Sequence, residues 1–217
     1  MPHCPALYEQ PSLPGLEPTG AWFRPEDSSH LPGTLLEYSL LLVVFPDLDD
    51  APHIAPAVSE LCSRHGLRSG RLQAGRLHVT LHRLLNFVDE IPQERMDACI
   101  AAAGSVVCRP LPLRFDRLLS FPRKVDAKHP FVLRCDARSD AGLALLRQSL
   151  AKALRGCGLR PLASSTPHMT MAYDRLVVPE HPIEPILWTA KRFSLIVSHV
   201  GRGYHQRIGA WALTGRA

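Results

Sequence analysis

Apolar residues recur along the chain in two rhythms, one typical of β-strands and the other of α-helices. Continuous or alternating apolar runs predict seven strands, over residues 34–45, 76–88, 111–121, 130–135, 168–174, 188–200 and 204–213. Apolar residues at helical spacing predict three helices, over residues 50–66, 92–107 and 139–156. Asp50 and Pro52 suit the start of the first helix, and Gly66 suits its end. Ser139 and Asp140 suit the start of the third helix, and a proline-rich connection is predicted over residues 175–187.

A helix precedes each of the strands at 76–88 and 168–174, which gives the chain a weak internal repeat. We interpret this repeat as two similar lobes related by a pseudo-two-fold axis. Mostly antiparallel sheets with helices on their outer faces give an α+β fold. We assign residues 34–217 to this bilobal domain. Residues 1–33 contain seven prolines and show no strand or helix period, so we assign them to an extended, Pro-rich N-terminal arm.

Charge and composition indicate mainly which kind of partner the protein binds. The chain carries 25 Lys and Arg against 20 Asp and Glu, a net charge of +5, which favours anionic partners such as nucleic acid or nucleotides. No apolar run is long enough to span a membrane and no signal peptide is visible, so we expect a cytoplasmic protein without membrane contact. The six cysteines show neither Cys-x-x-Cys nor zinc-ligand spacing. We therefore expect no disulfides, no metal and no other cofactor, and we expect a monomer.

Two short stretches, His78-Val79-Thr80 and His168-Met169-Thr170, share one pattern ninety residues apart. Of the eleven histidines, only these two have a serine or threonine two residues later. In a strand, residues i and i+2 point to the same face. Each stretch therefore places one imidazole and one hydroxyl side by side, and we expect the fold to bring the two pairs together.

Two imidazoles and two hydroxyls at one place suit in-line displacement at a phosphodiester. Histidine has an ordinary pKa of ~6.5, so one neutral and one protonated histidine form a general base and a general acid. Threonine hydroxyls can donate to anionic oxygens and stabilise charge in the transition state. The alternative is that both histidines are ordinary half-buried strand residues. A serine or cysteine nucleophile has no elbow motif to support it, and a phosphate-binding glycine loop is absent.

The two His-x-Thr motifs resemble those of the two-histidine (2H) phosphoesterase superfamily, and within it the RNA 2′,3′-cyclic phosphodiesterase or 2′-5′ RNA ligase family. Segments elsewhere in the chain extend the resemblance over residues 34–217, namely 119–122 with 131–133, 188–198 and 203–213. The resemblance implies a bilobal, pseudo-symmetric fold in which two sheets form a central groove. It also implies a metal-independent hydrolase that acts on 2′,3′-cyclic phosphate ends or 2′-5′ linkages of RNA or nucleotides. By that resemblance His78 is the general acid and His168 the base, while Thr80 and Thr170 hold the non-bridging oxygens.

Other residues are secondary candidates for substrate binding, each with an ordinary structural alternative. His82 is predicted on the face of His78 and Thr80, where it either touches the substrate phosphate or is solvated. Arg123 and Lys128 either follow an RNA backbone or belong to a solvated basic loop. Aromatic rings that could stack on a base, or pack in the core, are Phe121 and Tyr204. Two rival functions stay open, a phosphodiesterase for a small nucleotide such as ADP-ribose cyclic phosphate and a non-catalytic RNA-binding protein.

Overall fold

Eight strands and three α-helices make up the part of the chain that the structure, a computed structural model, describes: residues 37–47, 49–67, 71–88, 91–124, 127–162 and 166–215. The strands are β1 (Glu37–Val44), β2 (Val79–Val88), β3 (Leu111–Ser120), β4 (His129–Cys135), β5 (Met169–Asp174), β6 (His181–Ala190), β7 (Arg192–His199) and β8 (Tyr204–Ala212). The helices are α1 (Ala51–Arg64), α2 (Gln93–Gly104) and α3 (Ala137–Gly156), with a single 3₁₀ turn, η2 (Ala74–Arg76), before β2. The Pro-rich arm assigned to residues 1–33 lies outside the described residues.

The strands form one antiparallel sheet in the order β6-β3-β4-β5-β2-β1-β7-β8. The two central neighbours, β2 and β5, are paired at one position, Val79 with Met169, whereas the other neighbours are paired over several residues. The sheet therefore consists of two four-stranded halves that meet at a narrow seam. The α+β class is confirmed, and the two expected sheets are these two halves, joined at the seam.

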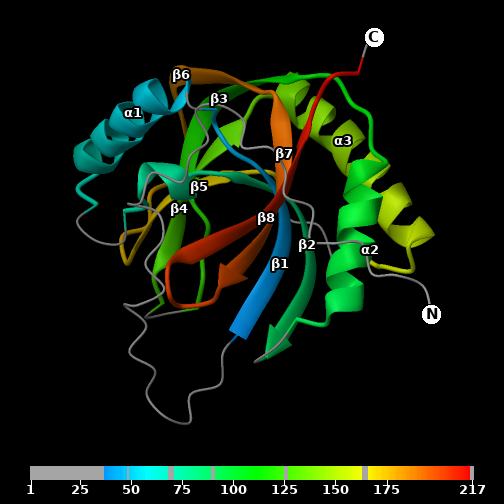
Figure 1. The fold of residues 1–217 in the computed structure, drawn as a ribbon. Helices are drawn as coiled ribbons and strands as arrows, with labels where there is room; N and C mark the ends of the chain where they lie inside the picture. Colours follow the sequence, from blue (N-terminus) through cyan, green and yellow to red (C-terminus); the bar gives the residue numbers. More distant parts are fainter. Residues whose placement is uncertain are drawn as a thin grey trace, which may run out of the picture. The chain divides into compact units, whose positions relative to one another are not determined.

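The helices cover the sheet with apolar faces. Figure 1 shows α2 and α3 side by side on the right and α1 on the left. Buried helix residues join the strand residues Val79, Leu81, Met169 and Met171 in one core; they are Ile54, Val58 and Cys62 on α1, Cys99, Ala102 and Ala103 on α2, and Leu143, Leu146, Leu150 and Leu154 on α3. Since the apolar residues of β2 and β5 at the seam face this core, the histidines and threonines between them face the opposite side. Within the described residues, every helix is too short or too polar to cross a membrane.

Strand β6 was not predicted, because its residues were assigned to a proline-rich connection. Pro182 and Pro185 lie within it, and a proline cannot donate a hydrogen bond to a neighbouring strand. β6 is an edge strand with β3 as its neighbour, and an edge is where a sheet tolerates proline. The predicted strand at 188–200 is in fact the end of β6 and the whole of β7, divided at Lys191.

The predicted faces of β2 hold only as far as Leu81. Val43 of β1 pairs with Thr80, and Leu42 pairs with His82, so Leu81 is an extra residue at a β-bulge. The bulge changes the alternation, and His82 is buried on the side that α3 covers, where its Nε2 lies 2.8 Å from the carbonyl oxygen of Arg147. The prediction that His82 shares the face of His78 and Thr80 is therefore wrong.

The third helix starts earlier than the sequence suggested, because its cap is Asp136 rather than Ser139 or Asp140. An Asp136 Oδ1 atom accepts a hydrogen bond of 2.8 Å from the backbone N–H of Ser139, which satisfies one of the free amides of the first turn. Ser139 is buried and its hydroxyl accepts a hydrogen bond from the backbone N–H of Arg114 on β3. This pair of bonds fixes the start of α3 against β3.

We expect Asp136→Ala to lower the free energy of unfolding by ~1 kcal/mol, and Asp136→Asn, which keeps a capping oxygen, to lower it less. The bond from Ser139 holds the pKa of Asp136 below its usual range. Its stabilising effect is therefore present above the pKa of the unfolded chain and is lost as the pH falls through the folded pKa. Urea denaturation at neutral and at acid pH checks this, and an alanine effect that is equal at both pH values would contradict it.

Candidate functional site

The seam between β2 and β5 brings the two His-x-Thr stretches together. Val79 and Met169 lie directly opposite each other in the antiparallel register. Continuing that register by one residue on each side puts His78 opposite Thr170 and Thr80 opposite His168. Each imidazole is therefore a cross-strand neighbour of the other motif's hydroxyl, on the face away from the core. All four side chains are half-buried, which leaves them accessible from that face.

Each imidazole is held by the backbone carbonyl two residues before it. The Nδ1 atom of His78 lies 2.7 Å from the carbonyl oxygen of Arg76, and the Nδ1 atom of His168 lies 2.7 Å from the carbonyl oxygen of Thr166. A carbonyl oxygen can only accept, so Nδ1 is the protonated nitrogen in both rings. The Nε2 atom of each ring is therefore the one that can exchange a proton with a substrate.

Burial and neighbouring charges keep both imidazoles neutral near pH 7. Burial lowers the pKa of His78 to about 4, the carbonyl of Arg76 opposes that shift, and the positive charges of Arg76 and His168 add to it. Burial also lowers the pKa of His168, with a further lowering from the Arg134 guanidinium, against the opposing effect of the Thr166 carbonyl. His168 is therefore close enough to His78 to affect its pKa.

An aromatic ring packs against each imidazole. The ring of Phe45 lies 5.6 Å from that of His78, and the ring of Phe121 lies 4.8 Å from that of His168, edge to face. Each phenylalanine directly follows a strand, β1 or β3, and each is followed by proline. Phe121 was predicted as a candidate and Phe45 was missed, although the repeated Phe-Pro dipeptide was a signal for it.

A third imidazole stands beside His78. The ring of His205, on β8, lies edge to face 5.1 Å from the ring of His78. Burial lowers the pKa of His205 to about 3, and the charges of His78, Arg76 and His199 lower it further. The same face of β8 carries Arg207, whose guanidinium lies 5.1 Å from the centre of the Phe45 ring. This flank of the site is therefore rich in cations and suited to an anionic ligand.

The remaining secondary candidates lie farther from the seam. Arg123 and Lys128 are exposed on the connection between β3 and β4. Tyr204 packs against His199, with ring centres 4.6 Å apart, and strand alternation turns it away from the face that carries His205. Phe121 is the one secondary candidate that the structure places in ring contact with a motif histidine.

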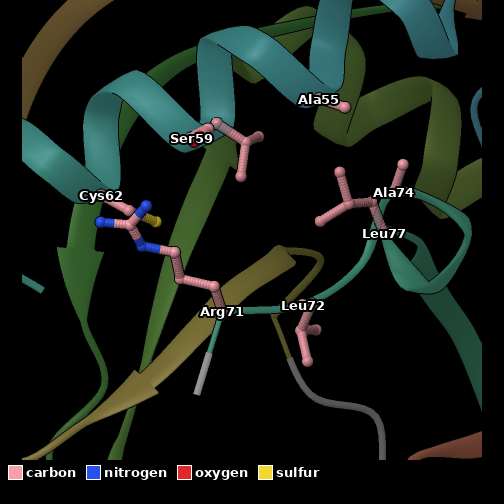
Figure 2. Close-up of a pocket in the computed structure, with 8 residues that line it drawn as sticks. Ala55, Ser59, Cys62, Arg71, Leu72, Ala74 and Leu77 are labelled. Carbon is pink, nitrogen blue, oxygen red and sulfur yellow. The ribbon is translucent and has the colours of Figure 1, made fainter. Parts of the chain in front are cut away.

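One cavity in the described residues has none of the four motif side chains in its lining (Figure 2). It has a volume of about 80 Å³, and it is lined by Ala55, Val58, Ser59, Cys62, Arg71, Leu72, Ala74 and Leu77. Leu77 lines this cavity from the chain segment that leads into His78. Ligand pockets are usually larger than ~300 Å³, so a nucleotide does not fit there. No group of three or more His, Cys, Asp or Glu residues is arranged as a metal site in the described part of the chain.

The sequence of residues 46–202 matches the family model of the 2′-5′ RNA ligase superfamily. The chain belongs to this superfamily. The match includes both His-x-Thr motifs, and membership supports an enzyme of the phosphoesterase and ligase type. Among curated proteins, none matches the chain.

Two solved structures have a similar fold. LigT of E. coli, complexed with 3′-AMP, is 21% identical and has a TM-score of 0.64, with 82% of this chain and 99% of LigT covered. TT0787 of Thermus thermophilus is 18% identical and has a TM-score of 0.63, with 82% of this chain and 100% of TT0787 covered. At these identities the similarity establishes a shared fold, the eight-stranded sheet with its helices.

Proposed function

We propose that this superfamily member is a metal-independent phosphodiesterase that acts on 2′,3′-cyclic phosphate ends or 2′-5′ linkages of RNA or nucleotides. The observation that carries the proposal is the seam pairing of Val79 with Met169, the two residues that stand between the histidine and the threonine of each motif. A phosphate at the seam then has one imidazole and one hydroxyl on either side. That is the set of groups that an in-line displacement needs at the attacking oxygen, the leaving oxygen and the two non-bridging oxygens.

The reaction divides into two proton transfers around one displacement. His168 Nε2 takes a proton from water as the water oxygen forms its bond to phosphorus. The bond from phosphorus to the 3′ oxygen breaks, and that oxygen takes a proton from His78 Nε2, which leaves a 2′-phosphate. Thr80 and Thr170 donate hydrogen bonds to the non-bridging oxygens, where negative charge accumulates. The assignment of acid and base follows the family resemblance, because the two motifs have the same local geometry.

Binding of an anionic substrate favours the protonated form that the general acid needs. His78 and His168 both have a pKa below the usual value in the free protein. A phosphodiester anion bound between them raises the pKa of both imidazoles, because an opposite charge nearby favours the protonated form. One ring can then hold a proton while the other remains a base.

The surroundings and the relatives agree with an anionic nucleotide as the substrate. Arg76 and Arg134 influence the pKa of the two histidines directly, and Arg207 lies over the neighbouring Phe45. Guanidinium groups are well suited to phosphate. LigT of E. coli has been crystallised with 3′-AMP, NADP+, ATP and phosphate.

Hydrolysis of 2′,3′-cyclic CMP in the presence of EDTA tests the proposal. We expect turnover that gives 2′-CMP, which phosphorus NMR distinguishes from 3′-CMP, and we expect added Mg²⁺ to leave the rate unchanged. Absence of turnover on both cyclic nucleotides and a 2′-5′-linked dinucleotide would contradict the proposal. RNA binding without turnover would instead favour the rival function of a non-catalytic RNA-binding protein.

We expect kcat/KM for 2′,3′-cyclic CMP to reach its maximum below pH 6.5, the ordinary pKa of histidine. This parameter reports the essential groups of the free protein, in which the pKa values of His78 and His168 are both lowered. Rising pH removes the proton of the acid and falling pH protonates the base, so the optimum lies between the two lowered values. The optimum of kcat lies at higher pH, because the bound anion raises both pKa values. A pH–rate profile measures both, and an optimum of kcat/KM above pH 6.5 would contradict the assignment.

A further inference from the structure

A second pair of histidines lies face to face away from the seam. His65 directly follows the last residue of α1, and His181 is the first residue of β6. Their Nε2 atoms are 3.0 Å apart, and their ring centres are 5.0 Å apart with an angle of 31° between the planes. Both side chains are half-buried, and the ring of Phe131 on β4 packs against His65 at 5.6 Å.

The other nitrogen of each ring is already committed. The Nδ1 atom of His65 lies 2.8 Å from the carbonyl oxygen of Leu61, and the Nδ1 atom of His181 lies 2.9 Å from the carbonyl oxygen of Pro179. Because carbonyl oxygens only accept, both Nδ1 atoms carry the proton of the neutral imidazole. Two Nε2 lone pairs then point at each other across 3.0 Å, an arrangement that repels unless a cation lies between them.

We propose that His65 and His181 form a binding site for a divalent transition-metal ion, in which the two Nε2 atoms are ligands. Imidazole nitrogen suits Ni²⁺, Cu²⁺ and Zn²⁺. An ion ~2.1 Å from each nitrogen would subtend an angle of roughly 90° across the 3.0 Å separation. That angle matches neighbouring ligands in the square or octahedral geometry of Ni²⁺ and Cu²⁺ better than the tetrahedral angle of Zn²⁺.

The carbonyl groups that accept from the two Nδ1 atoms also support a metal site. Histidines that bind metals almost always donate their other ring N–H to a carbonyl or carboxylate, which fixes the tautomer and the ring orientation. Both members of this pair do so. In the described residues no third His, Cys, Asp or Glu completes the group, so water fills the remaining positions and the site takes a metal that retains water readily.

The site is separate from the proposed catalytic groups. β6 is the outer strand of its half, and β3 and β4 lie between it and β5 at the seam. His65 packs against Phe131 of the core, whereas the motif side chains face the side away from the core. The chain before His65 comes from β1, in the opposite half of the sheet, so an ion at this pair ties α1 to the far edge of the other half. Metal binding therefore stabilises the fold and leaves hydrolysis metal-independent.

Calorimetric titration of the full chain, tag-free and treated with chelator, with Ni²⁺ tests the proposal. We expect one ion per chain, bound more weakly by roughly tenfold or more in His65→Gln and in His181→Gln. His53→Gln, which removes an exposed histidine elsewhere on α1, should bind as the wild type does. Ni²⁺ should raise the midpoint of thermal unfolding of the wild type and of His53→Gln but not of the other two variants.

Equal Ni²⁺ affinity in the wild type and in both pair variants would overturn the proposal, as would the absence of binding. Nitrogen NMR of the imidazoles gives a check that does not depend on stability. Ni²⁺ should broaden the Nε2 signals of His65 and His181 before those of other histidines. A proton shared between the two Nε2 atoms that Ni²⁺ does not displace would count against a metal site.

Discussion

We expect alanine at His78 or at His168 to lower kcat/KM for 2′,3′-cyclic CMP by ~10²–10⁴, the usual contribution of a general acid or base. The two rings are proposed to act on one phosphate, so removing both should reduce the rate by far less than the product of the single losses. His53→Ala is the matched control, because His53 is exposed on α1 and touches neither motif. Steady-state kinetics in EDTA, with circular dichroism to confirm folding, give the comparison. Wild-type rates in both motif variants would refute general acid–base catalysis by this pair.

The same variants separate the acid from the base. A p-nitrophenolate leaving group departs without taking a proton, so a substrate that carries it does not need the general acid. A nucleoside p-nitrophenyl phosphate should therefore restore much of the activity of His78→Ala and little of the activity of His168→Ala. The opposite result would exchange the two roles that the resemblance assigns.

We expect valine at Thr80 or at Thr170 to lower kcat by roughly 10²–10³, by analogy with the loss of one donor to a developing oxyanion. Valine keeps the branched shape that suits a strand and removes only the hydroxyl. Because the hydrogen bond strengthens as charge develops on the phosphate, kcat falls more than KM rises. Thr189→Val on β6, which pairs with Pro112 far from the seam, is the control. A change confined to KM would show that the hydroxyls hold the ground state and not the transition state.

The local part of this site could be predicted from sequence, since the period of a strand places His78 with Thr80 and His168 with Thr170. The position of the two pairs relative to each other could not be derived that way. It depends on the register at Val79 and Met169, which joins strands ninety residues apart. Only the expectation that the pairs meet was available, and it came from their matching pattern.

Other failures have particular physical causes. The bulge at Leu81 arises from pairing with β1, so nothing within the local sequence signalled that His82 turns toward α3. β6 was hidden because its prolines argue against a strand, and their tolerance depends on an edge position that only the assembled sheet defines. His205 has no counterpart in the sequence pattern. Its ring contacts that of His78 although β1 and β7 lie between β8 and β2 in the sheet, so only the assembled structure reveals the contact.

The single hydrogen-bonded position at the seam makes the middle of the sheet a pivot. The two four-stranded halves are each paired over several residues, so we expect any rotation between them to occur at the seam, where the pairing is least extensive. The four motif side chains lie next to that pivot, so a rotation moves them little while it moves the outer strands β6 and β8 much farther. We expect such a hinge to accommodate ligands of different lengths while the four motif side chains keep one arrangement.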